Sequence, residues 1–150
     1  MNVLLLCSIP NQGRHPQYHK TTDVDAIRNA IVALCEVISA ADGVLVYPED
    51  PEITALISPI LQQRQFRVEN EPLIQEVLEN IDFAVLIGGM GYELSIARRA
   101  RAAGTKVWPI GSTGWAARTL LAESVGFHPT TKASLQSTAY GPLFQAFLSL

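Results

Sequence analysis

The sequence predicts an α/β domain: a Rossmann-like, doubly wound parallel sheet of about five strands with helices on both faces. Three observations carry this prediction. Short apolar runs, typical of strands buried on both faces, alternate with stretches whose apolar residues recur at helical spacing. Glycine turns join strand to helix at residues 88–91 and 111–114. The 150 residues suit a single domain over 1–150 that buries roughly two-thirds of its unfolded surface.

The composition narrows the class of protein and its partners. Hydrophobic residues make up 48% and charged residues 17%, which is typical of a globular chain with a large core. The formal net charge is −3, and the only basic cluster is Arg98, Arg99 and Arg101, so a nucleic-acid partner is not expected. No run approaches the roughly 18 apolar residues of a membrane span. We therefore expect a soluble, cytoplasmic protein without membrane contact, with Cys7 and Cys35 as buried thiols and with no metal or cofactor.

The first half of the chain contains two strands, three helices and a possible edge strand. Thr22 and Asp25 have the spacing of a capping box, with Asp in place of Glu, and predict the start of an amphipathic helix that ends near residues 42–43. Asp50 predicts a helix cap with Pro51 at the first position. The expected elements are a strand at 3–7, a loop at 8–16, strands at 44–47 and 66–68, and a helix at 72–80.

The second half begins with the most apolar strand, at residues 83–87, which leads through the first glycine turn into a helix that Gly104 ends. Pro109 lies inside the next strand and indicates an edge position, because proline cannot donate to a neighbouring strand. The remaining expected elements are a strand at 106–110, a helix at 115–125, a loop at 128–139 and a helix at 142–150.

Three loops leave from the carboxyl ends of predicted strands, at residues 8–16, 88–92 and 111–114. Ligands of open α/β sheets bind at that edge, and the loops converge if the first and fourth strands are neighbours. Glycine allows close backbone approach, and a helix N-terminus offers free N–H donors to phosphate. We expect side chains placed at Gly88 or Gly89 to enter the phosphate space. The predicted ligand-binding residues are Ser8, Ile9, Arg14, Gly88, Gly89, Met90, Gly91, Gly111, Ser112, Thr113 and Gly114.

Several short motifs resemble the SLOG superfamily, and most closely its branch associated with Sir2 and TIR domains. The resemblance rests on residues 7–10 with Tyr18, residues 45–47 and 51–54, residues 87–90, and residues 109–114. It implies a Rossmann-like domain that senses ADP-ribose or a related cyclic or phosphorylated nucleotide, acting as a homo-oligomer or together with an effector protein. The chain departs from the family at residues 48–50, where Pro-Glu-Asp stands in place of a Gly-Gly-His segment.

Glu93 is the candidate catalytic residue. Residues 91–97 followed by 103–107 resemble the nucleophile motif of nucleoside 2-deoxyribosyltransferases, and the LOG phosphoribohydrolases of the SLOG superfamily carry a related glycine motif. This resemblance implies an N-glycosidic hydrolase or transferase in which Glu93 attacks an anomeric carbon. A first-turn glutamate favoured by the helix dipole is the alternative.

The leading hypothesis is therefore a binding module for a nucleotide-derived small molecule. An N-glycosidase or deoxyribosyltransferase that uses Glu93 is the second, and a degenerate oligomerisation module is the third. Trp115 either stacks on a base or belongs to the core, and the three clustered arginines form either a binding patch or an exposed helix face.

Overall fold

The structure, a computed structural model, describes residues 1–10 and 16–149. Its sheet has five strands in the order β3-β2-β1-β4-β5, and every paired strand runs parallel to its neighbour. This confirms the predicted fold class and the edge positions expected for β3 and β5. The strands are β1 (Asn2–Ser8), β2 (Val44–Pro48), β3 (Gln65–Val68), β4 (Phe83–Gly88) and β5 (Lys106–Ile110).

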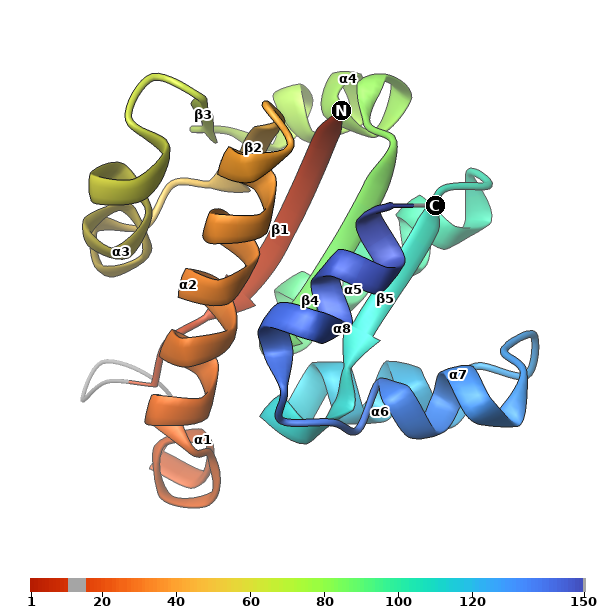
Figure 1. The fold of residues 1–150 in the computed structure, drawn as a ribbon. Coiled ribbons are helices and arrows are strands. Elements are labelled where there is room, and N and C mark those ends of the chain that lie inside the picture. The colour runs from red at the N-terminus through yellow and green to blue at the C-terminus, as the bar shows by residue number, and fades with distance from the viewer. Residues whose placement is uncertain (11–15, 150) are drawn as a thin grey trace.

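Helices cover both faces of this sheet (Figure 1). Apolar residues of α2, α3 and α8 form one core cluster with alternate residues of the strands. Residues of α4, α5 and α6 form the second cluster on the opposite face. The helices are α1 (Pro16–Thr21), α2 (Val24–Ala40), α3 (Pro51–Leu61), α4 (Glu71–Asn80), α5 (Gly91–Ala102), α6 (Trp115–Glu123), α7 (Pro129–Ser134) and α8 (Tyr140–Leu148), with a short 3-10 turn η1 (Gly111–Thr113).

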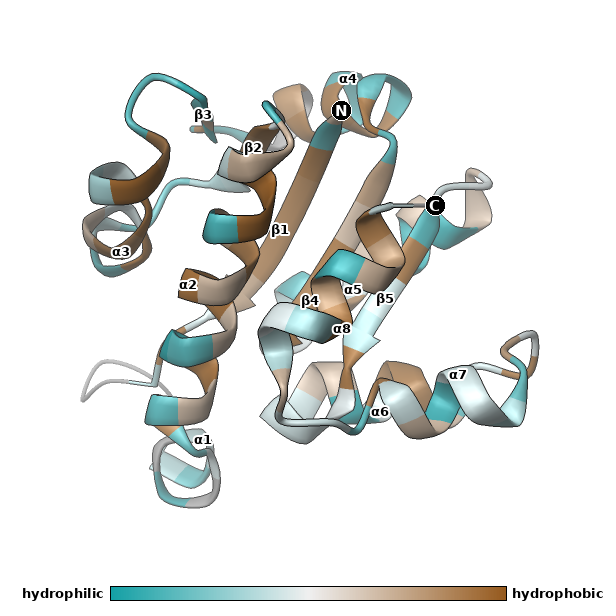
Figure 2. Cartoon of the chain, in the orientation of Figure 1, coloured by the Kyte–Doolittle hydropathy of each residue, from teal (hydrophilic) through white to brown (hydrophobic). Residues whose placement is uncertain are grey.

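The central strands are apolar along most of their length because both faces of the sheet are covered, as the brown colour of β1 and β4 shows (Figure 2). In β1, Leu5 and Cys7 face α2, whereas Leu4 and Leu6 face the α5 side. A single strand therefore contributes to both cores. Both cysteines are buried and neither forms a disulfide, as expected.

Two local predictions are wrong. The N-cap of α2 is Asp23, whose carboxylate accepts the Ala26 N–H at 3.0 Å, rather than Thr22; both residue types cap helices, so spacing alone misplaces the start. The expected loop at 128–139 contains α7. Its first turn is stabilised by Pro129 at the first position and by the His128 Nδ1, which accepts the Thr130 N–H at 3.2 Å.

Helix α1 was also not predicted, since the sequence shows only polar residues around Tyr18 there. Among the residues that the structure describes, no helix combines the length and the apolar character that a bilayer span requires.

Candidate functional site

The carboxyl ends of β1, β4 and β5 reach the same edge of the sheet, where α6 begins (Figure 1). β1 and β4 are direct neighbours, with Ser8 opposite Gly88. The chain order reverses between these two strands, which is the place where open α/β sheets bind ligands. The predicted ligand-binding residue Arg14 lies outside the described residues.

Tyr18 of α1 braces the two strands at this point. Its buried hydroxyl donates to the Ser8 carbonyl oxygen at 2.6 Å and accepts the Gly89 N–H at 3.0 Å. Its ring meets the Trp115 ring edge-on, with centroids 4.9 Å apart and planes at 77°. Tyr18 therefore joins the main chains of β1 and β4, although the sequence patterns did not predict its helix, α1.

Thr113 makes a second brace, between β4 and β5. Its Oγ1 accepts the Gly88 N–H at 2.7 Å and donates to the Ile110 carbonyl oxygen at 2.6 Å. The side chain is buried, so both bonds are shielded from water. Thr113 belongs to the predicted binding set, and in this geometry its hydroxyl holds two strand ends together.

Glu93 also binds a main-chain N–H group of the glycine turn. It lies at the third position of α5, and its Oε2 accepts the Met90 N–H at 2.9 Å. The residue is 8% exposed. Its carboxylate therefore caps its own helix, which is the structural role weighed for it from the sequence.

These contacts change the interpretation of the glycine turn. The N–H groups of Gly88, Gly89 and Met90 were expected to be free for a phosphate. They are bound instead by Thr113, Tyr18 and Glu93, in that order. Oxygen atoms of the protein itself therefore occupy the positions where phosphate oxygens were expected, because buried N–H groups need acceptors.

The expectation that side chains at Gly88 and Gly89 would enter a ligand space is also wrong. A Cβ at Gly88 would lie 2.9 Å from Ile27 Cδ1 and 3.0 Å from the Tyr18 hydroxyl, and one at Gly89 would lie 3.0 Å from Glu93 Cβ. Their φ angles of +56° and +87° favour glycine. Both glycines are required by close packing of the protein against itself.

The second glycine turn is anchored to the chain that follows α7. The Gly111 N–H donates to the Leu135 carbonyl oxygen at 2.8 Å. The Ser112 hydroxyl donates to the Ser137 carbonyl oxygen at 3.0 Å. Gly114 has a φ of +87° and a ψ of −171°, a conformation that is almost restricted to glycine. The turn is therefore fixed by the C-terminal segment.

Two predicted residues of the first loop differ in their surroundings. Ile9 is 1% exposed and belongs to the core on the α2 side. Ser8 is fully buried, and its Oγ has no hydrogen-bond partner within the described chain. By strand alternation the Ser8 side chain lies on the same face as Leu4 and Leu6, which is the face that α5 covers.

A hollow of about 330 Å³ opens between the first turns of α5 and α6, and we call it the α5–α6 hollow. It is lined by Met90, Gly91, Leu94, Trp115, Ala116, Arg118 and Thr119. Of the predicted ligand-binding residues, it contains Met90 and Gly91. A Cβ at Gly91 would meet no atom within 4 Å, so the turn is open on this side.

Arg118 is the cation that lines this hollow, and it was not among the ligand-binding residues predicted from the sequence. Its Nη2 lies 3.9 Å from the position of a Cβ at Gly114, so the guanidinium folds back over the first turn of its own helix. Within the described residues it has no hydrogen-bond or ion-pair partner. The sequence does contain one indication of this position. Arg118 follows Gly114 by four residues, which is about one helical turn, so its side chain can reach the start of the helix.

The electrostatics of the α5–α6 hollow favour an anion. Helix N-termini carry partial positive charge, and α5 and α6 both begin here. A guanidinium held at a helix N-terminus adds to that charge instead of cancelling it. Trp115, at the rim, has a φ of +40°, which is uncommon for an aromatic residue and strained.

Comparisons with known proteins concern the fold alone. No family model matches the chain, and no curated protein matches it. Among solved structures, the chain is similar to the X-ray structure of TM1055, target VT76 of the Northeast Structural Genomics Consortium. The two share 14% sequence identity with a TM-score of 0.62, over 81% of this chain and 80% of that one. The chain has a fold like that of TM1055.

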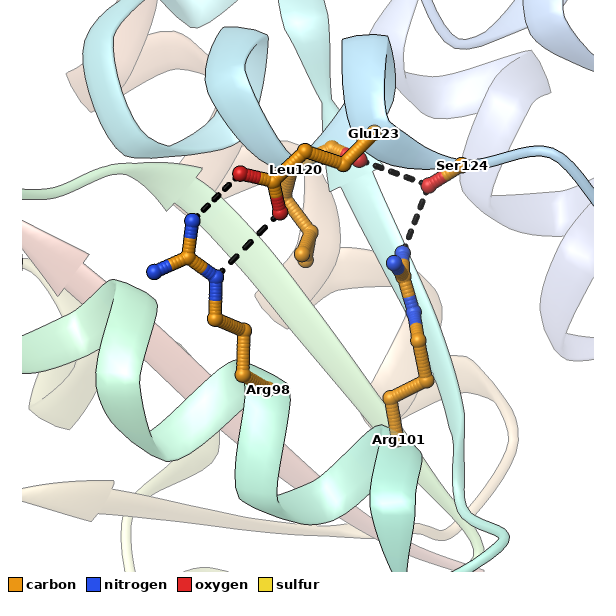
Figure 3. A network of polar contacts seen from close by, with 5 residues as sticks. All are labelled: Arg98, Arg101, Leu120, Glu123 and Ser124. Atoms are coloured by element: carbon orange, nitrogen blue, oxygen red, sulfur yellow. Dashed lines mark hydrogen bonds and ion pairs between the residues drawn. The ribbon is translucent and has the colours of Figure 1, made fainter.

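The clustered arginines belong to the opposite end of α5, and two of them tie it to the end of α6 (Figure 3). Arg98 forms a two-pronged ion pair with Glu123 and holds the pKa of that carboxyl below its ordinary value. Arg101 donates to the Ser124 hydroxyl at 2.6 Å, which donates to the Leu120 carbonyl oxygen at 2.6 Å. These arginines have structural partners and lie away from the α5–α6 hollow.

Proposed function

We propose that this chain is a binding module for a nucleotide-derived small molecule, with a phosphate held in the α5–α6 hollow. ADP-ribose and related cyclic or phosphorylated nucleotides are the ligand class implied by the resemblance to SLOG domains. The observation that carries the proposal is the unpaired Arg118 guanidinium at the point where two helix N-termini meet. Two helix N-termini and one guanidinium contribute positive potential around the hollow, against the single carboxylate of Glu93 at the start of α5, and this balance favours a phosphate over a neutral ligand.

This site differs from the one expected from the glycines alone. The buried N–H groups of the turn already have partners, so the phosphate has to bind on the outer side, against Gly91 and the first turn of α5. The first-turn N–H groups of a helix have no partner within the helix, and they point out of its start. The site proposed here uses those groups together with Arg118.

The remaining walls are suited to the organic part of such a ligand. Met90, Leu94 and the half-buried Trp115 give the hollow an apolar side next to its cationic side. Base and ribose rings pack on apolar and aromatic side chains, while a few polar groups fix the orientation. The volume of about 330 Å³ is at the small end of ligand sites, so it suits part of a dinucleotide or one mononucleotide.

The buried Ser8 hydroxyl supports the same edge of the sheet. A buried polar atom without a partner is uncommon in folded proteins and calls for an explanation. Ser8 is fully buried and does not line the α5–α6 hollow, so a bridging water would supply the missing partner and connect it to a bound ligand.

Isothermal titration calorimetry tests the proposal with ADP-ribose, NAD, nucleoside monophosphates and inorganic phosphate. We expect binding of at least one phosphorylated ligand, weakened about 10- to 100-fold by Arg118→Gln, since a hydrogen bond to a charged group contributes about 1.5–3 kcal/mol. Lys106→Gln is the matched control, because it removes one positive charge at the start of β5, the other end of the sheet. Equal affinity of Arg118→Gln and the parent would show that the anion binds elsewhere.

An N-glycosidase or deoxyribosyltransferase that uses Glu93 is the second candidate. The capping bond to the Met90 N–H places a carboxylate within one turn of the α5–α6 hollow. To act as a nucleophile, the carboxylate has to leave that bond. Incubation with nucleoside monophosphates and deoxynucleosides, followed by chromatography, tests this activity. Free base released by the parent and not by Glu93→Gln would support it, and no release by either would refute it.

A further inference from the structure

We propose that the free edge of β3 pairs with β3 of a second copy of this chain. The two strands run antiparallel about a twofold axis, with Phe66 opposite the second copy's Phe66. The two five-stranded sheets then become one continuous sheet. This surface is separate from the α5–α6 hollow, and the inference does not depend on the proposed ligand.

The main chain of β3 has one side free for pairing. The carbonyl oxygens of Arg64 and Val68 accept the N–H groups of Leu45 and Glu49, so these two carbonyls point toward β2. Main-chain groups alternate in direction along a strand. The N–H and carbonyl groups of Gln65 and Arg67 therefore point away from β2, toward the outside of the sheet.

Phe66 supplies the apolar contact. Its side chain is 54% exposed, which makes it one of the few large hydrophobic residues on the described surface. It borders a hollow of about 360 Å³ on the α4 side, lined also by Leu73, Glu76, Val77 and Asn80. An exposed aromatic side chain beside a partly apolar hollow is complementary to a twofold copy of itself, because each ring can cover the other's hollow.

The register follows from the same residues. In the proposed register, Gln65 lies opposite the second copy's Arg67, and the main-chain N–H and carbonyl groups of these two residues bond to each other. The two Phe66 residues lie between these hydrogen-bonded pairs and form a non-hydrogen-bonded pair. The side chains of such a pair approach most closely, with Cα atoms about 4.5 Å apart. A shift that places Arg67 opposite its own copy sets two like charges together. A shift to Gln65 opposite Gln65 separates the aromatic rings.

The other edge of the sheet does not offer the same surface. β5 contains Pro109, which has no N–H, and the Gly111 N–H that follows is bound by the Leu135 carbonyl oxygen. At β3, α3 and α4 flank the strand and extend the surface available to a second copy. β3 is only four residues long, so we expect a dimer that dissociates on dilution.

Sedimentation equilibrium over a range of concentrations tests the dimer. The parent should approach the mass of two chains as concentration rises, and Phe66→Asp should stay at the mass of one chain. Val125→Asp is the matched control, since Val125 is 97% exposed and lies away from β3. A parent that remains at one chain up to about millimolar concentration, the weak limit for a useful interaction, overturns the proposal, and so does a Phe66→Asp variant that still forms dimers.

Two further variants keep the test decisive if Phe66→Asp fails to fold. Phe66→Cys should form a disulfide-linked dimer when diamide accepts the two thiol hydrogens, because paired Cβ atoms lie close enough and the native Cys7 and Cys35 are buried. Val125→Cys, treated in the same way, should form far less. Arg67→Pro removes an outward N–H while leaving the bonds to β2, and it should lower the dimer fraction. A Phe66→Cys variant that cross-links no better than Val125→Cys refutes the register.

Discussion

Replacing Tyr18 by Phe tests the idea that one hydroxyl joins β1 to β4. The substitution keeps the ring and its contact with Trp115 but removes the oxygen that serves the Ser8 carbonyl and the Gly89 N–H. Tyr18 is fully buried, so water cannot replace the hydroxyl without rearrangement. Both main-chain groups are then left without a partner.

The expected loss follows from these two orphaned groups. Each buried, unsatisfied polar group costs about 1–3 kcal/mol, so Tyr18→Phe, which leaves two such groups, should lower the free energy of unfolding by about 2–6 kcal/mol. At about 3 °C per kcal/mol for a domain of this size, Tm should fall by about 6–18 °C. Urea denaturation followed by circular dichroism measures the first quantity, and calorimetry measures the second.

Tyr47→Phe provides the control. Tyr47 is equally buried, but its hydroxyl bonds only to the side chains of Gln65 and Thr54, at 2.7 and 3.0 Å. Those partly exposed side chains can turn toward water, so the loss should be nearer to 1 kcal/mol. If Tyr18→Phe costs no more than Tyr47→Phe, the hydroxyl does not brace the strands and the argument fails.

Three further predictions concern Thr113, Gly111 and the buried thiol of Cys35. Thr113→Val should lower the free energy of unfolding by about 2 kcal/mol in urea titrations because two buried bonds are lost, and Thr113→Ser should restore most of it. Gly111→Ala should lower the free energy of unfolding by about 1–3 kcal/mol, since its Cβ would lie 2.6 Å from Leu121 Cδ2. A Cβ at Gly91 meets no atom within 4 Å, so Gly91→Ala should be nearly neutral. Burial and a neighbouring glutamate raise the pKa of Cys35 to about 12, above the ordinary value of about 8.5 that applies in the unfolded chain. The resulting stability is fully present below about pH 8.5 and is lost as pH rises toward 12, so the parent should lose more stability than Cys35→Ala between about pH 8 and pH 10.5.

The sequence predicts the sheet well because its signals are local. Four apolar runs, the Asp50-Pro51 cap and the edge position of Pro109 each depend on neighbours along the chain, and the structure confirms them. The adjacency of β1 and β4 was left open by the sequence, as the condition under which the three loops converge, and the structure shows the two strands paired.

The site was harder to predict because its contacts join distant residues. The hydroxyl of Tyr18 and the N–H of Gly89 are 71 residues apart, and Thr113 reaches Gly88 across 25 residues. A glycine turn looks the same in the sequence whether a ligand or the protein's own oxygens bind its N–H groups. Arg118 was missed for a related reason. The sequence shows only an arginine on a helix, and the structure is needed to place its guanidinium over the start of that helix.

The anchoring of the second glycine turn bears on the order of events during synthesis. The turn at Gly111 depends on Leu135, and the Trp108 ring of β5 stacks on Phe147 of α8 with centroids 4.4 Å apart. α8 in turn packs on α2, more than a hundred residues earlier. While residues 129–148 are still being made, β1, β2 and α2 are already available to fold, but the face of β5 that α8 packs against has no cover. A chain truncated near residue 125 and released from the ribosome should therefore expose Trp108 on that face, which makes it a substrate for chaperones.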